Sequence, residues 1–360
     1  MKAEQHEHRR RGTTRLVTIC LAAVVAIAGV TALFARGAAA DPILPPLTAS
    51  ELLNRVAAAE VDGMSATFKQ RSDLGLPALP SGMGETGEDL QSALALLTGE
   101  HTIRVWTAGK EHSRVSLVDG STESSVIRSG DQLWTWSSEE QKAGHATIDA
   151  TASKPRPSGA PNSPAEAIAE LLAAIGPSTE VATSGTGYVA GRPVYQLILT
   201  PRDSNSLVGQ VRVSVDAAEF VPLGVRVLDR DDAEAVSLVA SAVHFAVPDA
   251  DVFAFAPPPG ADVTELDRTS SDRPSGEPKG DAPKKVGSGW TTVLVTRTGT
   301  TGAPDPAARV LLDSLPAVSG DWGSGRLLST SLVNIVITDD GRVAIGSVTE
   351  KLLYDALAAR

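Results

Sequence analysis

The chain has 360 residues, a formal net charge of −11 and a hydrophobic fraction of 42%, which is enough apolar mass for a globular core. So acidic a chain would repel a phosphate backbone, which argues against nucleic acid as a partner. The single cysteine, Cys20, excludes an intrachain disulfide and a cysteine-rich metal site.

The first 40 residues have the composition of an export signal. A cationic flank ending at Arg15 precedes 19 residues without a charge, Leu16 to Phe34, and Ala38-Ala39-Ala40 offers a cleavage site. The apolar run is also long enough to span a bilayer, so residues 1–40 are either a cleaved signal peptide or a membrane anchor. In both cases we expect an exported cell-envelope protein, anchored or secreted, on the outer side of the cytoplasmic membrane.

The next part of the chain alternates between helix and strand signals. A capping box at Thr48 to Glu51 predicts a helix that extends to about Ala59, and a second box at Ser163 to Glu166 predicts the helix Pro164 to Ile175. A further helix is expected from Leu90 to Leu97. Strands are predicted at Ala66 to Gln70, Thr102 to Thr107, Ser113 to Val118, Ser124 to Arg128 and Gln132 to Ser137. Trp134 and Trp136 share one face of the last strand, where they either pack in the core or line a ligand site.

The stretch from Val194 to Val263 carries the clearest strand pattern. Val211, Val213 and Val215 alternate with polar residues, which predicts antiparallel strands with one apolar and one solvated face. The glycine-rich run Gly185 to Gly191 precedes a strand and is therefore a hairpin turn, not a dinucleotide-binding loop.

The remainder of the chain predicts a second, smaller unit. Residues 266–289 are nearly all polar, Pro or Gly and form a linker. Residues 290–360 form a small α+β domain with helices at Pro306 to Leu315 and Thr349 to Ala358. A domain of this size is marginal alone, so we expect it to dock on the first domain or on a partner.

The sequence offers no catalytic pattern. The histidines after residue 40 are scattered, and neither a nucleophile elbow nor a phosphate-cradling loop occurs. We therefore expect a binding protein that is not an enzyme and that holds neither metal nor cofactor. Helices against the apolar side of the sheet would enclose a cavity for an acyl chain or a lipidated peptide.

The block from Val194 to Val263 resembles the LolA/LolB family of lipoprotein carriers and the related RseB/MucB regulators. The resemblance rests on the strand Tyr195-x-Leu197-x-Leu199-x-Pro201, the pair Val221-Pro222, and the closing run Phe253-x-Phe255-x-Pro257-Pro258-Pro259-Gly260-x-Asp262-Val263. The earlier strand Leu133-Trp134-x-Trp136 also matches, so the resemblance covers about residues 48–265. Composition and arrangement look like those of the LolA-like exported proteins of actinobacteria.

The resemblance implies an incomplete antiparallel β-barrel covered by helices over residues 48–265, followed by the linker and the small C-terminal α+β domain. It implies an apolar cavity that binds lipid or an acylated lipoprotein. An alternative is an envelope-stress regulator that binds a membrane anti-sigma factor. Arg104 is a candidate for the arginine that the carriers use near the cavity mouth. The candidate lining residues are Leu197, Leu199, Val213, Val215, Val225, Val227, Trp134 and Trp136.

Overall fold

The computed structural model describes residues 44–76, 98–148, 176–185, 187–266, 283–297 and 312–359. The predicted N-terminal segment (residues 1–40) and the predicted helices Leu90 to Leu97 and Pro164 to Ile175 lie outside the described residues. Most of the predicted helix Pro306 to Leu315 also lies outside them.

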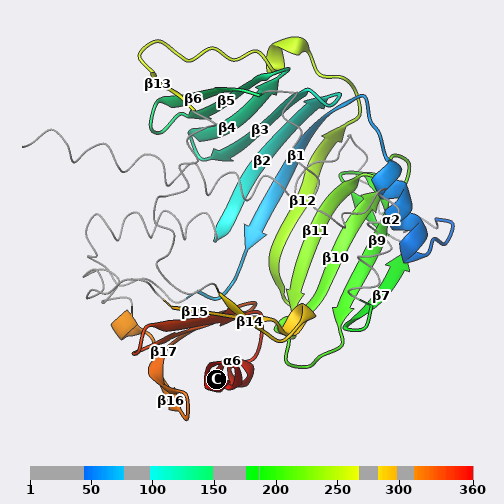
Figure 1. The fold of residues 1–360 in the computed structure, drawn as a ribbon. Coiled ribbons are helices and arrows are strands. Elements are labelled where there is room, and N and C mark those ends of the chain that lie inside the picture. The colour runs from blue at the N-terminus through cyan, green and yellow to red at the C-terminus, as the bar shows by residue number, and fades with distance from the viewer. Residues whose placement is uncertain are drawn as a thin grey trace, which may run out of the picture.

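Thirteen strands form one large curved sheet in the order β13-β6-β5-β4-β3-β2-β1-β12-β11-β10-β9-β7, with β8 paired to β9 (Figure 1). All pairs are antiparallel except β13 with β6. The strands are β1 (Gly63–Ser72), β2 (Gly99–Ala108), β3 (His112–Asp119), β4 (Thr122–Ser129), β5 (Gln132–Ser137), β6 (Lys142–Thr147), β7 (Thr179–Ser184), β8 (Tyr188–Val189), β9 (Arg192–Pro201), β10 (Val208–Asp216), β11 (Pro222–Asp229), β12 (Glu234–His244) and β13 (Asp262–Glu265).

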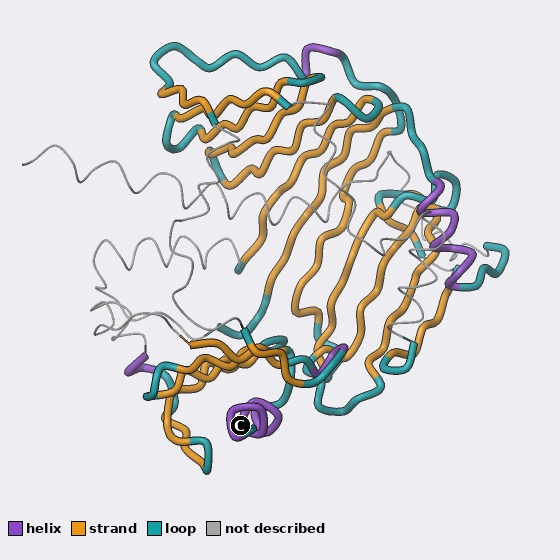
Figure 2. The backbone as a smooth tube through the Cα atoms, viewed as in Figure 1, coloured by secondary structure: helices purple, strands orange, loops and turns teal. Residues whose placement is uncertain are grey.

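Short turns explain why neighbours in the sequence are neighbours in the sheet. Gly109, Gly120 and Gly130 begin three successive hairpin turns between β2 and β5, each with positive φ, a conformation that glycine adopts at little cost. The edge strands β13 and β7 do not pair with each other, so the sheet is an open arc (Figure 2). The predicted fold class, an incomplete barrel with a small second domain, is confirmed.

The helix α2 (Ala49–Ala58) begins as predicted. The Thr48 side chain accepts a hydrogen bond from the Glu51 backbone, and the Glu51 carboxylate accepts from the Thr48 backbone N–H at 2.8 Å. These hydrogen bonds lower the pKa of Glu51, with the Thr48 backbone as the largest cause. The amphipathic helix buries Leu52 completely against the sheet.

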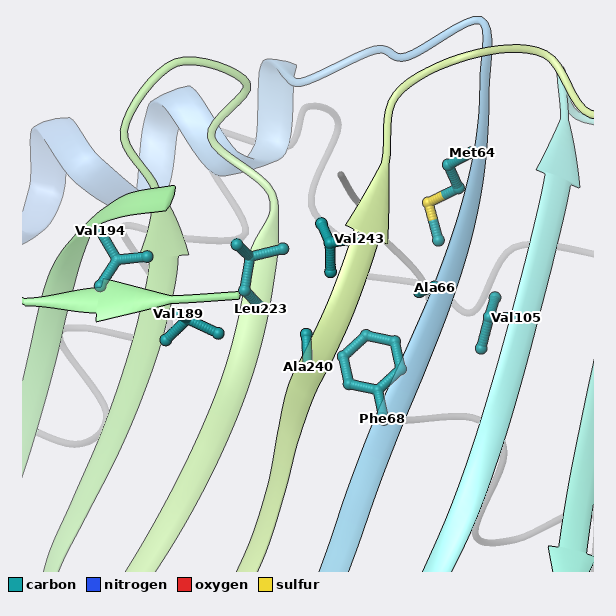
Figure 3. Packing of buried hydrophobic residues seen from close by; sticks show 9 residues of the cluster. All are labelled: Met64, Ala66, Phe68, Val105, Val189, Val194, Leu223, Ala240 and Val243. Carbon is teal, nitrogen blue, oxygen red and sulfur yellow. The ribbon is translucent and has the colours of Figure 1, made fainter. Parts of the chain in front are cut away.

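The main core lies where β8 and the start of β9 cross over the middle of the sheet. Figure 3 shows this hairpin bringing Val189 and Val194 to Leu223, beside Phe68 and Ala240 from the central strands. The chain reverses direction at Ala190 and Gly191, which both have positive φ. This is the hairpin turn that the glycine-rich run Gly185 to Gly191 predicts.

The C-terminal domain is a six-stranded sheet in the order β14-β15-β19-β18-β17-β16, with helix α6 packed on one face. Its sheet begins within the predicted linker, because Lys284–Val286 pairs with β15 although this charged segment has no hydrophobic strand signal. Its elements are β14 (Lys284–Val286), β15 (Val293–Arg297), β16 (Ala317–Gly320), β17 (Gly323–Ser329), β18 (Asn334–Thr338), β19 (Arg342–Gly346) and α6 (Glu350–Ala358). Short 3-10 turns occur at Ala250–Val252 and Gly289–Thr291.

Candidate ligand-binding face

The strand register brings apolar side chains from distant parts of the chain onto one face of the large sheet. Residues directly opposite each other on antiparallel strands share a face. Leu197 pairs with Val213, Val213 with Val225, and Val225 with Leu238. From there Leu238 faces Gln70 on β1, and its neighbour Ala240 faces Phe68, which faces Ile103 on β2. We call this side the apolar face, and the other side the opposite face.

One end of the apolar face is covered by α2 and the segment before it. Leu52 packs with Tyr195, Leu197 and Val215, and Leu199 and Val213 lie at the margin of this cluster. The Tyr195 hydroxyl donates to the Pro45 carbonyl at 3.0 Å, and the Thr183 hydroxyl donates to the Leu47 carbonyl. The chain ahead of α2 is therefore held against β7 and β9.

The other end of the apolar face meets the C-terminal domain. Leu332, Val333 and Trp290 pack with Leu74, which follows β1, and with five residues of the large sheet, which are Val208, Val211, Val227, Ala235 and Val236. The junction is completed by backbone pairing, because Leu207 N–H donates to the Ser347 carbonyl and Thr349 N–H to the Asn205 carbonyl, both at 2.9 Å. The Trp290 indole donates to Thr179 Oγ1 at 2.7 Å. Of the two predicted alternatives, docking on the first domain or on a partner, these contacts show the small domain docked on the first domain.

The structure brings together six of the nine sequence-predicted site residues. Leu197, Leu199, Val213 and Val215 lie on the apolar face near α2, and Val227 lies near the C-terminal domain. Val225 lies between them, partly accessible. The apolar face also contains Val236, Leu238 and Ile103, which sequence reasoning missed. The alternation of Val236, Leu238 and Ala240 in β12 was the signal that could have found two of them.

The other three predicted site residues lie on the opposite face. Trp134 and Trp136 pair with Ile127 and Ser125, and Ser125 pairs through Ser116 with exposed Arg104, so all three point away from Leu197. Both indoles contact Phe255, at centroid distances of 5.5 and 5.9 Å. The loop that carries Phe255 therefore packs on the opposite face, where the two tryptophans form part of its support.

A hydrogen-bonded network lies beneath the same loop. Arg114 donates to Glu123 at 2.9 Å and to the Val252 carbonyl at 3.3 Å, while Ser116 and Ser125 also donate to Glu123. Burial raises the pKa of Glu123, but the hydrogen bonds from Ser125, Ser116 and Arg114 outweigh it, so the pKa is lowered overall. Glu123 is thus held ionised, and its hydrogen bonds link β3 to β4 beneath this loop.

His145 contacts a carboxylate that is distant in the sequence. Its Nδ1 lies 2.9 Å from Glu265 on β13, its Nε2 lies 2.6 Å from Gln132, and its ring stacks on Trp134 at 4.2 Å. These contacts attach the edge strand β13. Within the described ranges, no group of three or more His, Cys, Asp or Glu side chains could hold a metal ion. None of the helices described is long and apolar enough to cross a membrane.

Comparisons with known proteins agree with this architecture. The open sheet with a small second domain is the architecture that the sequence resemblance implies. Residues 96–251, which span β2 to the 3-10 turn after β12, match the family described as the MucB/RseB N-terminal domain. The predicted resemblance to the RseB/MucB family is therefore confirmed for these residues. A search of curated proteins finds no match.

This chain is also similar, at low sequence identity, to solved structures. The complex of MucA and MucB from Pseudomonas aeruginosa matches with 16% identity and a TM-score of 0.44, covering 86% of this chain and 96% of that chain. A LolA superfamily protein from Nitrosomonas europaea matches with 14% identity and a TM-score of 0.22, covering 58% of this chain and 99% of that one.

Proposed function

We propose that this protein is an exported, non-enzymatic binding protein that holds acyl chains of a lipid or lipoprotein against the apolar face. The main support for the proposal is an apolar row across four strands, Leu197-Val213-Val225-Leu238. Val213, Val225 and Leu238 are only partly buried. A soluble sheet rarely leaves such a surface without a use.

Energetics support an acyl ligand. Burial of one methylene contributes about 0.8 kcal/mol, so burial of about 15 methylenes contributes about 12 kcal/mol. After a cost of association of about 4 kcal/mol, about 8 kcal/mol remains, which corresponds to micromolar affinity. The row extends from Leu197 under α2 to Leu238 beside the main core, so it suits an elongated guest. The N-terminal segment is proposed to direct export and, if uncleaved, to keep the protein at the membrane.

Mass spectrometry of the full chain, purified from envelope membranes in a non-ionic detergent, tests this proposal. We expect bound mass that extracts into organic solvent as lipid or acylated peptide. Leu199→Glu should reduce it several-fold by placing a charge on the apolar face. Ile198→Glu is the matched control, because it adds the same charge one residue away on the opposite face, where Ile198 pairs with Arg212. Equal lipid content in both variants and the wild type would refute the proposal.

A second candidate function is regulation through a membrane protein. It is favoured by the MucB/RseB match and by a C-terminal domain packed on the large sheet. One similar structure is a complex of MucB with the periplasmic part of MucA. We propose by analogy that this chain binds a membrane anti-sigma factor. Cross-linking of the full chain in cells, followed by identification of its partners, tests this; recovery of no membrane protein, with unchanged stress transcription on gene deletion, contradicts it.

A further inference from the structure

Three arginines form a row across the opposite face of the large sheet. Arg212 on β10 lies directly opposite Arg226 on β11, which lies opposite Ser237 on β12. Ser237 in turn lies opposite Arg71 on β1. Adjacent strands are about 4.8 Å apart, so the three Cα atoms fall within roughly 15 Å along one line.

The charges of this row are incompletely balanced. Arg226 pairs with Glu234 at 3.0 Å, and Arg71 shares Glu100 with Lys69, at 2.8 and 3.3 Å. Arg212 has no carboxylate partner among the described residues, and its Nε donates to the neutral Gln210 side chain. Four cations therefore face two carboxylates, on a chain whose net charge is −11.

This arrangement is unfavourable for the protein alone. Like charges directly opposite each other on antiparallel strands repel and destabilise the pair. The side chains remain available to a ligand, because Arg226 is 34% and Arg71 68% exposed. A local conflict of this kind, in which Arg212 faces another arginine and has no carboxylate partner among the described residues, is typical of a functional site.

We propose that the Arg212–Arg226 pair, continued by Arg71, binds a phosphate-bearing ligand. A guanidinium fork matches two oxygens of a phosphate, and the remaining oxygens and second charge of that phosphate can engage the neighbouring arginine. A single carboxylate has only two oxygens, and carboxylates already occupy Arg226 and Arg71. The ligand is either free phosphate or a lipid headgroup that is a phosphate monoester, because both present at least three free oxygens and a second charge.

Calorimetric titration of the full chain in a non-ionic detergent tests the site with three probes: inorganic phosphate, glycerol phosphate and acetate. We expect saturable binding of a phosphate probe and none of acetate. Arg212→Gln should weaken phosphate binding by roughly tenfold, and Arg212→Lys should restore only part of it, because lysine keeps the charge but loses the fork. The control is Arg104→Gln, an exposed arginine on the same face without an opposing arginine, which should bind like the wild type.

The outcomes separate the ligand sources and the alternatives. Binding of inorganic phosphate alone indicates a free anion, whereas tighter binding of glycerol phosphate indicates a headgroup; both support the site. No saturable binding, equal binding of acetate, or an equal loss in Arg104→Gln would overturn it. A lower unfolding temperature of Arg212→Gln would also overturn it, since relief of repulsion predicts an equal or higher one. Leu199→Glu should leave phosphate binding unchanged, so the result is independent of the proposed acyl site.

Discussion

Replacing Asp216 with alanine is expected to destabilise the large domain by about 3 kcal/mol, because it breaks a buried ion pair. The Asp216 carboxylate is fully buried and accepts hydrogen bonds from the Arg192 guanidinium and from the backbone N–H groups of Ala218 and Glu219, at 3.0 and 2.8 Å. The hydrogen bond to Asp216 is the largest cause that raises the pKa of Arg192, which therefore keeps its charge.

The size of this loss of stability follows from the donors that Asp216→Ala would leave without their carboxylate acceptor. Loss of one partner of a buried pair typically costs 3 to 5 kcal/mol, and about the lower value applies because the Arg192 side chain is 24% exposed and lies over Phe245 at 4.7 Å. Two backbone N–H groups would also lose their acceptor, and the turn that holds Phe220 at a φ of 56° would lose its cap.

Scanning calorimetry of the full chain measures the effect as a fall of roughly 6 to 12 °C in the unfolding temperature of the large domain. Asp216→Asn should fall between the wild type and the alanine variant, because the amide oxygen still accepts from the backbone. Asp229→Ala is the matched control, since Asp229 caps an exposed turn by accepting from Asp231 and Ala233 N–H at 2.9 and 3.0 Å. A cost for Asp216→Ala no larger than that of the control would refute the reasoning.

Three further outcomes follow from the structure. Because the pKa of Glu123 is lowered in the folded protein, the ionised carboxylate stabilises the fold above the usual glutamate pKa, and this stabilisation is lost as the pH falls through the lowered pKa. Glu123→Gln should therefore flatten the dependence of the free energy of unfolding on acid pH. Parallel pH curves for the variant and the wild type would contradict this prediction. Leu332→Ala should weaken the domain junction by about 2 to 5 kcal/mol and increase the radius of gyration in X-ray scattering, whereas exposed Leu294→Ala should not. Gly209→Ala should lower the free energy of unfolding by about 1 to 3 kcal/mol in denaturant titration, because the added Cβ would lie 2.0 Å from the Asp229 carbonyl oxygen. Gly224→Ala is the control, because its Cβ would lie 3.3 Å from the Val239 side chain. An equal loss of stability in both variants would contradict this prediction.

Local sequence signals accounted for the elements whose causes are local. The capping box of α2, the glycine turns between β2 and β5 and the valine alternation of β10 each depend on residues a few positions apart, so each was predictable. β14 carries no such signal, because pairing with β15 holds its charged residues in a strand.

The candidate site was only partly predictable, because its geometry depends on register. Alternation showed that Val213 and Val225 each lie on an apolar side. It could not relate that side to the side of Trp134, because β5 is seven strands from β10 and six from β11 in the sheet order. Only the ladder of paired residues placed the tryptophans and Arg104 on the opposite face. The same ladder brought Arg212 opposite Arg226 and His145 beside Glu265.

The sequence by itself determined an antiparallel sheet with one apolar face, a small second domain and the resemblance of the large domain to the RseB/MucB family. It also predicts an export signal and a polar linker. These properties follow from composition and short-range periodicity, which do not depend on contacts between distant segments. The tertiary structure alone decided which apolar residues share a surface, where the C-terminal domain packs against it and which charges are left unbalanced. These features arise from contacts between segments up to hundreds of residues apart, whose energies appear only when the sheet is assembled.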